Sequence, residues 1–464
     1  MTDKESGLKK SLNLIYVYIA ATGAIFTFVA YWDSVFYKYT GAGTFIAFAL
    51  MALCILPIGF VYGELSSIFK QNGGELIYNT VGLNKHVGFF SSWLIMAAWI
   101  SVPPAVVMGI MTWISYQFKL NLDFKYIVIL GIVILLIYFM LSLQDVQFLI
   151  KAQGIMLFSN IATTLITSLL ILFSGHWSIS NLTPLFNSKL IGQAGMPAWI
   201  IGMALLITPF FGFETVPEMV EEGDFPIKDT GKAIRGSVIT CAAIYVFYFF
   251  CIAGLGTSSQ LLTADSANGF LAIVAMKNLL GWEIWPLIFG LASVLLGMGA
   301  SLLGFWMATV RLLYAMGEQN YLPKAFTKVN KHQQPILPNI FLLVISVVFI
   351  FLQNASNFME SFFNLMAFGC ACAYALTMIS AMRIHGKHPE WATYRLPGGQ
   401  FTRLISLIIA LVIAFFTSLG QGLNSWLSFL VYLGVGIILW LYMVLVLWRK
   451  TDVVVHTPDG PLNL

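Results

Sequence analysis

The sequence has 464 residues, of which 59% are hydrophobic and 9% are charged, and its mean hydropathy is +0.85. Soluble domains carry about 25% charged residues, so a soluble protein is excluded and one membrane domain over residues 1–464 is expected. The formal net charge is only +4 and the basic residues form no stripe, which excludes nucleic-acid binding.

Twelve apolar runs are long enough to cross a hydrocarbon layer of about 30 Å as helices. With the N-terminus in the cytoplasm, 19 of the 24 Lys and Arg fall on the cytoplasmic side, as the positive-inside rule requires. An even number of spans then places both termini in the cytoplasm. In chain order, the expected spans lie near residues 11–36, 41–64, 87–118, 124–144, 147–174, 196–221, 235–258, 284–316, 336–353, 359–384, 402–421 and 425–448.

Two of these spans are interrupted near mid-depth. The first contains the small-residue stretch Ala20–Ala24, and the sixth contains Pro209 and Gly212. Paired interruptions in corresponding helices of two halves indicate a binding site at the midplane of an inverted-repeat transporter. The alternative is that these residues are simply frequent in membrane helices.

Four ordered motifs resemble those of the amino acid-polyamine-organocation (APC) permeases. They extend over nearly the whole chain, and one departs from the family pattern because Ala24 stands where a glycine is usual. The motifs are Ala21-Thr22-Gly23-Ala24-Ile25-Phe26; Tyr62-Gly63-Glu64-Leu65-Ser66 with Asn72-Gly73-Gly74-Glu75-Leu76-Ile77-Tyr78; Gly212-Phe213-Glu214 with Glu221-Glu222 and Pro226; and Arg311-Leu312-Leu313-Tyr314-Ala315-Met316 with Leu322-Pro323 and Pro338.

This resemblance implies an all-α polytopic membrane protein of 12 transmembrane helices with a leucine-transporter-type fold. Residues 11–174 and 196–385 would form two inverted repeats of five helices each, with helices one and six unwound around the substrate, and residues 402–448 would add two helices. The implied function is secondary active transport of an amino acid across the plasma membrane by alternating access, with no cofactor.

The first break offers donors for a substrate carboxylate. If the helix is interrupted there, backbone N–H groups of Thr22, Gly23 and Ala24 are free at the positive end of a half-helix, and such donors bind carboxylates. Ala20 is assigned to the same substrate site. The alternative for the Thr22 side chain is a hydrogen bond back to its own helix.

The sixth-helix break offers acceptors for a substrate amine. The carbonyls of Thr208 and Phe211 are expected to lose their helical partners beside Pro209 and Gly212. Thr208, Phe211 and Gly212 are assigned to the substrate site. The Thr208 hydroxyl has the same alternative as that of Thr22, a bond within its own helix.

Glu214 is the only carboxylate that the sequence places well inside a span. An ionisable residue within the membrane is a functional candidate because burial of its charge is costly. Some APC members carry an acidic residue here with a proton-sensing role, so the resemblance implies proton coupling at Glu214. The alternative is a carboxylate permanently bonded to a neighbouring helix.

An aromatic residue is expected to close the substrate site. Counting back from Leu322-Pro323, Phe305 falls where an aromatic ring stacks on substrate in similar arginine/agmatine exchangers, although a packing role is the alternative. The lysine that couples protons in other members is absent between Ala152 and Ser174. Sodium ranks below protons because Ser293 and Ser301 form no diagnostic pair.

Other charges are interpreted as solvated. Glu64 and Arg311 are near cytoplasmic helix ends, where snorkelling accounts for them. The acidic stretch Glu218–Asp224 is expected to be a solvated loop face, with pairing to Arg235 or Arg311 as the alternative.

Enzymatic function is excluded by the absence of catalytic motifs. The histidines lie in loops or tails without metal-ligand spacing, so neither a catalytic nor a metal site is expected. Within transport, the alternative to an amino acid is a polyamine or a small amine such as ethanolamine, taken up or exchanged. A non-transporting sensor on the same fold is the alternative from another class.

Overall fold

The structure, a computed structural model, describes the chain apart from residues 1–6, 28, 121, 187–194, 264–268 and 354–357. Its helices are α1 (Leu14–Ile25), α2 (Asp33–Thr40), α3 (Thr44–Ile68), α4 (Gly74–Gly82), α5 (Lys85–Gln117), α6 (Phe124–Ser142), α7 (Val146–Leu172), α8 (Ala198–Leu205), α9 (Thr230–Leu255), α10 (Ser258–Leu261), α11 (Leu271–Leu280), α12 (Ile284–Gly290), α13 (Met298–Glu318), α14 (Ile336–Gln353), α15 (Phe358–Lys387), α16 (Gln400–Leu419) and α17 (Leu423–Tyr442).

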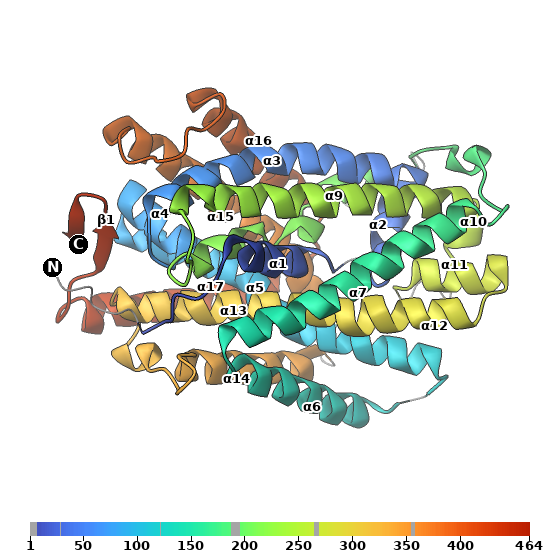
Figure 1. The fold of residues 1–464 in the computed structure, drawn as a ribbon, viewed down its shortest axis with the longest axis horizontal. Helices are drawn as coiled ribbons and strands as arrows, with labels where there is room; N and C mark the ends of the chain where they lie inside the picture. Colours follow the sequence, from blue (N-terminus) through green and yellow to red (C-terminus); the bar gives the residue numbers. More distant parts are fainter. Residues whose placement is uncertain (1–6, 28, 121, 187–194, 264–268, 354–357) are drawn as a thin grey trace.

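Short 3₁₀ segments connect several of these helices, and two π-helical segments extend others. The 3₁₀ segments are η1 (Gly41–Gly43), η2 (Ile179–Leu182), η4 (Thr208–Phe210), η5 (Phe213–Met219), η6 (Ile227–Asp229) and η9 (Lys324–Thr327), and the π segments are η8 (Leu291–Gly297) and η10 (Met443–Leu447). Most long helices run along the long axis of the molecule, and α7 crosses them obliquely (Figure 1). We call the two ends of the molecule along this axis the α4 end and the α11 end.

Ten helical stretches in the described part of the chain are long and apolar enough to cross a membrane, so this is a multi-pass membrane protein. Three further apolar helices are shorter, namely Leu14–Ile25, Leu271–Leu280 and Ile336–Leu352. The ten are Asp33–Ile68, Lys85–Gln117, Phe124–Ser142, Val146–Leu172, Ala198–Met219, Ile227–Leu255, Ile284–Glu318, Met366–Lys387, Gln400–Leu419 and Leu423–Leu447.

The expected first span, residues 11–36, is not continuous. Helix α1 ends at Ile25, and α2 begins only at Asp33. Two of the basic residues used to predict the orientation, Lys4 and Lys189, lie outside the described residues.

Exposed apolar side chains separate the outer helices from the inner ones. Helices α6, α7, α14, α16 and α17 expose large aliphatic residues, such as Ile155 on α7 and Leu430 on α17. In contrast, every residue of α13 from Met298 to Gly317 is buried. Apolar faces of this kind are stable where hydrocarbon covers them, so α13 is a central helix and α6, α14, α16 and α17 belong to the rim.

The central helices pack around the interrupted segments. Helix α1 contacts α7, α9, α13 and η5, while α3 runs alongside α9 (Figure 1). Helix α15 packs against α5 and α16. The breaks in the first and sixth apolar runs are therefore held inside a layer of continuous helices.

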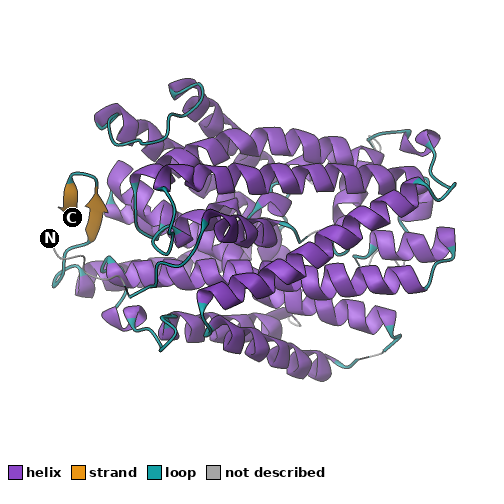
Figure 2. Ribbon diagram, in the orientation of Figure 1, coloured by secondary structure: helices purple, strands orange, loops and turns teal. Residues whose placement is uncertain are grey.

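The C-terminus forms a strand pair that the sequence does not predict. Strands β1 (Val454–Thr457) and β2 (Gly460–Asn463) are antiparallel, with Val454 opposite Asn463. The pair lies at the α4 end (Figure 2). Gln71 Nε2 donates to the His456 carbonyl at 2.8 Å, and Asn320 Nδ2 donates to the Asp452 carbonyl at 2.7 Å. These bonds fix the hairpin to the loops beside α4 and α13.

Candidate functional site

The two interrupted segments meet directly beside α13. Gly212, between η4 and η5, has a φ of +124°, a conformation that favours glycine. A Cβ atom added to Gly212 would lie 2.8 Å from the Ala24 Cβ, and one added to Gly304 would also lie 2.8 Å from it. The methyl group of Ala24 therefore lies between Gly212, in the break after α8, and Gly304 of α13.

The first break lies later in the chain than the sequence predicts. Ala20, Thr22, Gly23 and Ala24 are all buried within α1, which ends at Ile25. The expectation that the N–H groups of Thr22–Ala24 are free is wrong, because these groups are inside the helix. The alanines of this stretch are the best helix formers and outweigh the single glycine. The unpaired backbone groups at this end of a helix are carbonyls.

Those carbonyls accept hydrogen bonds from the surrounding helices. Ser301 Oγ donates to the Ala24 carbonyl at 2.9 Å, Tyr245 Oη to that of Ile25 at 2.8 Å, and Asn160 Nδ2 to that of Phe26 at 3.2 Å. One turn earlier, Gln153 Nε2 donates both to the Ala20 carbonyl at 3.2 Å and to the Ala300 carbonyl at 2.9 Å. Side chains of α7, α9 and α13 thus satisfy the end of α1.

The hydroxyl groups of Thr22 and Thr208 both bond within their own helical segments, which is the alternative given for them from the sequence. Thr22 Oγ1 donates to the Tyr18 carbonyl at 2.7 Å, and Thr208 Oγ1 donates to the Leu205 carbonyl at 2.9 Å. The Thr208 carbonyl accepts the Phe211 N–H at 3.1 Å, so it is not free as expected. The Phe211 carbonyl has no donor among the described residues.

A small cavity lies between α5, α13 and the break after α8. It encloses about 30 Å³ and brings together three of the predicted substrate residues, Thr208, Phe211 and Phe305. Ala20, Thr22, Gly23, Ala24 and Gly212 do not line it. No Asp, Glu, Lys, Arg or His is part of its lining, which consists of Thr27, Trp32, Ala98, Val102, Ala105, Val106, Thr208, Phe211, Met298, Ser301, Phe305 and Met366.

Glu214 is buried next to this cavity without lining it. Its Oε2 accepts the Gly212 N–H at 2.9 Å, and its Oε1 accepts Trp99 Nε1 of α5 at 3.1 Å. These are the contacts of a carboxylate that links a broken helix to its neighbour.

Two charged pairs expected to be solvated are buried. Arg311 of α13 makes a two-point ion pair with Glu222, with Nη2 and Oε1 2.9 Å apart, so the alternative pairing is correct for Glu222. The solvated interpretation is wrong for Glu218 and Glu222, which are buried, whereas Asp224 is exposed. Arg403 of α16 binds both oxygens of Glu64 at 2.5 and 2.9 Å. Snorkelling therefore does not explain Glu64 or Arg311.

Further buried carboxylates show that Glu214 is not unique. Asp33 accepts the N–H groups of Ser34, Leu271 and Ala272 and the Tyr248 hydroxyl at 2.8 to 3.1 Å. Those bonds tie α2 to the start of α11 and to α9. Asp33 is at the end of a predicted span, which is why the sequence does not distinguish it from a solvated residue.

A row of buried polar residues on α7 is also missed when the sequence of this helix is examined only for a lysine. Gln153, Asn160, Thr164 and Thr167 recur at helical spacing and are all fully buried. Uncharged polar residues at this period within an apolar run indicate a face that hydrogen-bonds to neighbouring helices. Gln153 and Asn160 use that face to bind the end of α1.

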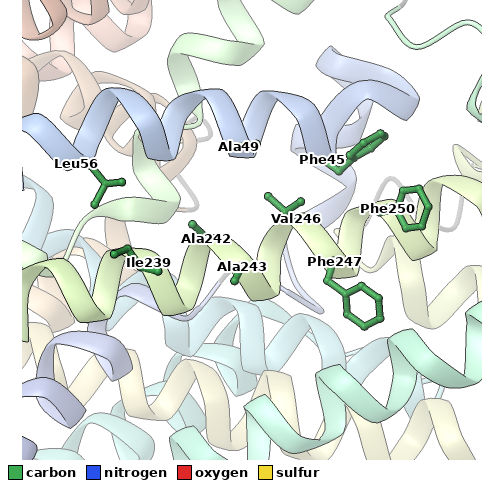
Figure 3. Close-up of a pocket in the computed structure, with 9 residues that line it drawn as sticks. All are labelled: Phe45, Ala49, Leu56, Ile239, Ala242, Ala243, Val246, Phe247 and Phe250. Atoms are coloured by element: carbon green, nitrogen blue, oxygen red, sulfur yellow. The ribbon is translucent and has the colours of Figure 1, made fainter.

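A second, larger hollow lies on the outside of the bundle between α3 and α9 (Figure 3). It encloses about 540 Å³, and its lining is wholly apolar, consisting of Phe45, Ala49, Leu56, Ile239, Ala242, Ala243, Val246, Phe247 and Phe250. Because a specific polar ligand needs a few placed hydrogen-bonding groups, this groove is not the candidate site.

The arrangement defines a class of protein: a multi-pass membrane protein whose cavity lies beside two interrupted apolar segments. The described residues contain no group of three or more His, Cys, Asp or Glu that could hold a metal ion. The family model for amino acid permeases matches residues 12–444, so the chain belongs to the amino acid permease family, whose members are transporters and not enzymes. This match confirms the resemblance to the APC permeases.

Similar characterised proteins cover most of the chain at low identity. The methylthioribose transporter of Bacillus subtilis is 24% identical over 86% of this chain and 85% of its own length. The aspartate-proton symporter of the same organism is 24% identical over 93% of this chain and 84% of its own. Its branched-chain amino acid permease is 22% identical over 95% and 94% of the two chains.

Proposed function

We propose that this protein moves neutral amino acids across the plasma membrane by alternating access. The proposed moving units are the inverted repeats, residues 11–174 and 196–385, with the helices of residues 402–448 as an addition. The α4 end is the cytoplasmic end, and both termini are cytoplasmic. The family membership and the meeting of the two breaks at Ala24 support this proposal.

The lining of the cavity carries the choice of substrate. Phe211 and Phe305 supply aromatic faces, and Thr208 and Ser301 supply hydroxyl groups, whereas the lining contains no ionisable side chain. A buried net charge needs a partner. A zwitterionic amino acid with an uncharged side chain has no net charge, whereas an acidic, basic or polyamine substrate would leave its net charge uncompensated here. A neutral, largely apolar side chain fits, as for the relative named a branched-chain amino acid permease.

The size of the cavity supports a mechanism of alternating access. A cavity of about 30 Å³ has room for a few water molecules, so we infer that a bulky amino acid such as leucine enters only when the surrounding helices move. Separation of α5 and α13 from the break after α8 would enlarge the cavity toward one side of the membrane.

Proton coupling through Glu214 is part of the proposal. The carboxylate is fully buried and hydrogen-bonds the backbone of Gly212, so a change in its protonation acts directly on the second break. One relative is named an aspartate-proton symporter. Sodium ranks below protons in this proposal because Ser293 and Ser301 form no diagnostic pair.

The test is uptake by the reconstituted protein. Proteoliposomes are supplied with labelled valine, leucine, phenylalanine, aspartate, lysine, putrescine and methylthioribose, at two pH values and with or without sodium. Uptake of the neutral amino acids, driven by an inward proton gradient, is expected. Methylthioribose is the second candidate, because it is uncharged and a relative is named for its transport.

Each other outcome contradicts a stated part of the proposal. Uptake of putrescine or aspartate in preference to leucine refutes the argument from the uncharged lining, and uptake of no compound refutes transport and favours the sensor alternative. The Glu214→Gln variant should lose the dependence of uptake on pH. An unchanged dependence refutes coupling at Glu214, and the exposed Glu283→Gln serves as the matched control.

A further inference from the structure

Two more carboxylates are buried near Glu214, farther along toward the α4 end. Glu75 is the second residue of α4, Glu218 is the residue before the end of η5, and neither side chain is exposed to solvent. A Cβ atom added to Gly74 would lie 2.8 Å from Glu218 Oε1, so the carboxylate of Glu218 rests on the backbone next to Glu75. Glu75 interacts electrostatically with both Glu218 and Glu214.

No cation is bonded to Glu75 or Glu218 among the described residues. The nearest guanidinium, that of Arg311, is bound at two points to Glu222 and is therefore already neutralised. Tyr62 Oη donates to Glu75 Oε1 at 2.5 Å. Glu75 Oε2 and both oxygens of Glu218 have no side-chain hydrogen-bond partner in the described part of the chain, and only the backbone N–H groups of Glu75 and Gly73 act on the two carboxylates from the main chain.

Neutral polar atoms around the pair are unpartnered too. Asn72 Nδ2 and Gln319 Oε1 are buried without a hydrogen-bond partner among the residues described. Asn72 directly precedes Gly73-Gly74, and Gln319 Nε2 donates to the Asn72 carbonyl at 3.4 Å. The space between the 72–75 loop, η5 and the end of α13 is therefore polar and not saturated by hydrogen bonds.

Two adjacent buried carboxylates do not both remain ionised. Burial of each ionised carboxylate costs several kcal/mol without a partner, and repulsion between like charges adds to this cost. Carboxylate pairs in such surroundings hold a proton and titrate together.

We propose that Glu75 and Glu218 form a proton-binding pair at the α4 end, distinct from Glu214, that holds a proton while this end is closed. The pair connects η5 to the 72–75 loop, and separation of these segments would admit water, favour ionisation and release the proton on that side. Its role in transport rests on the proposed function, whereas proton binding itself does not.

The charged and titratable groups facing the pair come from five elements. Tyr62 of α3 and Tyr78 of α4 are close to Glu75, Glu214 of η5 and Arg311 of α13 act on one carboxylate each, and Cys370 and Tyr374 of α15 interact with Glu75. Burial raises the pKa of Glu75 from 4.5 to about 8, and the Tyr62 hydrogen bond opposes part of this rise.

The first test measures proton binding by the purified full-length protein. A group with a raised pKa stabilises the folded protein fully below pH 4.5, and this contribution is lost as the pH rises through about 8. The thermal unfolding midpoint of the wild type should therefore fall between about pH 5 and about pH 8. Each bound proton contributes up to tenfold per pH unit to the unfolding equilibrium constant. The Glu75→Gln/Glu218→Gln double variant should flatten this slope.

The second test measures transport. With a labelled amino acid that the wild type accepts, exchange at fixed pH should persist in the double variant, while the dependence of exchange on the pH at the α4 side should be lost. Tyr62→Phe removes the 2.5 Å hydrogen bond and leaves both carboxylates in place, so it should shift the pH profile without abolishing it. Glu283→Gln, an exposed substitution, is the control and should match the wild type.

Specific results would overturn the proposal. A double variant that folds and keeps the wild-type slope of stability against pH shows that the pair binds no proton. A flat profile in Glu214→Gln together with a wild-type profile in the double variant assigns the proton to Glu214 alone. Absence of transport by the wild type refutes the proposed function, but the stability measurement still decides whether the pair binds a proton.

Discussion

The buried ion pair between Arg311 and Glu222 allows a prediction in which the two partners differ. Each side chain has about 1% of its surface exposed, and apart from Glu222 the only recorded acceptor for the guanidinium in the described residues is the Met307 carbonyl at 3.3 Å. Glu222→Leu leaves an arginine that stays charged at any accessible pH. Breaking a buried pair in this way costs about 3 to 5 kcal/mol.

Arg311→Met leaves the Glu222 carboxyl without a partner, and this group can become neutral by binding a proton. The remaining carboxyl takes up a proton, which costs about 1.4 kcal/mol for each pH unit above an ordinary carboxyl pKa, or about 3 to 4 kcal/mol near pH 7. Lowering the pH to about 5 should restore most of the lost stability to Arg311→Met and none to Glu222→Leu. The double variant should lie within about 1 kcal/mol of the wild type, because replacing both partners removes the charges together.

The measurement is unfolding of each purified variant in mild detergent at both pH values, with Arg403→Met as a second buried arginine partner for comparison. Equal losses in the two single variants, unchanged by pH, would refute the reasoning. So would a double variant whose loss equals the sum of the single losses, because the two residues would then act independently.

Two further predictions concern the backbone around the site. Gly212→Ala should destabilise the protein by about 1 to 3 kcal/mol and abolish uptake, because a methyl group there is strained at a φ of +124° and meets the Ala24 Cβ at 2.8 Å. Uptake and thermal stability are compared with those of Gly434→Ala, where an added Cβ meets nothing within 4 Å. Equal behaviour of the two variants contradicts this account. Asp33→Ala should lower the free energy of unfolding by about 2 to 5 kcal/mol, because four buried donors lose their acceptor. Urea unfolding, compared with that of the exposed Asp123→Ala variant, tests this prediction. A decrease below about 1 kcal/mol would show that these donors find other partners.

Several features of the site follow from local sequence pattern. Pro209 and Gly212 predict the second break, since one removes a backbone donor and the other permits a positive φ. Thr208, Phe211 and Phe305 line one cavity, whereas the other residues assigned to the substrate site do not. The prediction of the second break succeeds because backbone chemistry at a proline or glycine is decided by the residue itself and its immediate neighbours.

Other features depend on contacts between distant residues. The end of α1 is set by donors from Tyr245, Asn160 and Ser301 on three other helices, and no pattern within residues 20–26 contains them. Glu64 and Arg403 are 339 positions apart, so their burial follows only from the packing of α3 on α16. The charges of Glu218 and Glu222 look solvated in a loop sequence for the same reason.

The C-terminal hairpin has a consequence for the order in which the protein assembles. Its bond from Gln71 to the His456 carbonyl joins residues 385 positions apart. A chain is synthesised from its N-terminus, and contacts of large sequence separation form late because they wait for both partners. Gln71 therefore lacks its hairpin partner until the last residues of the chain are made, so this contact is among the last to close at the α4 end.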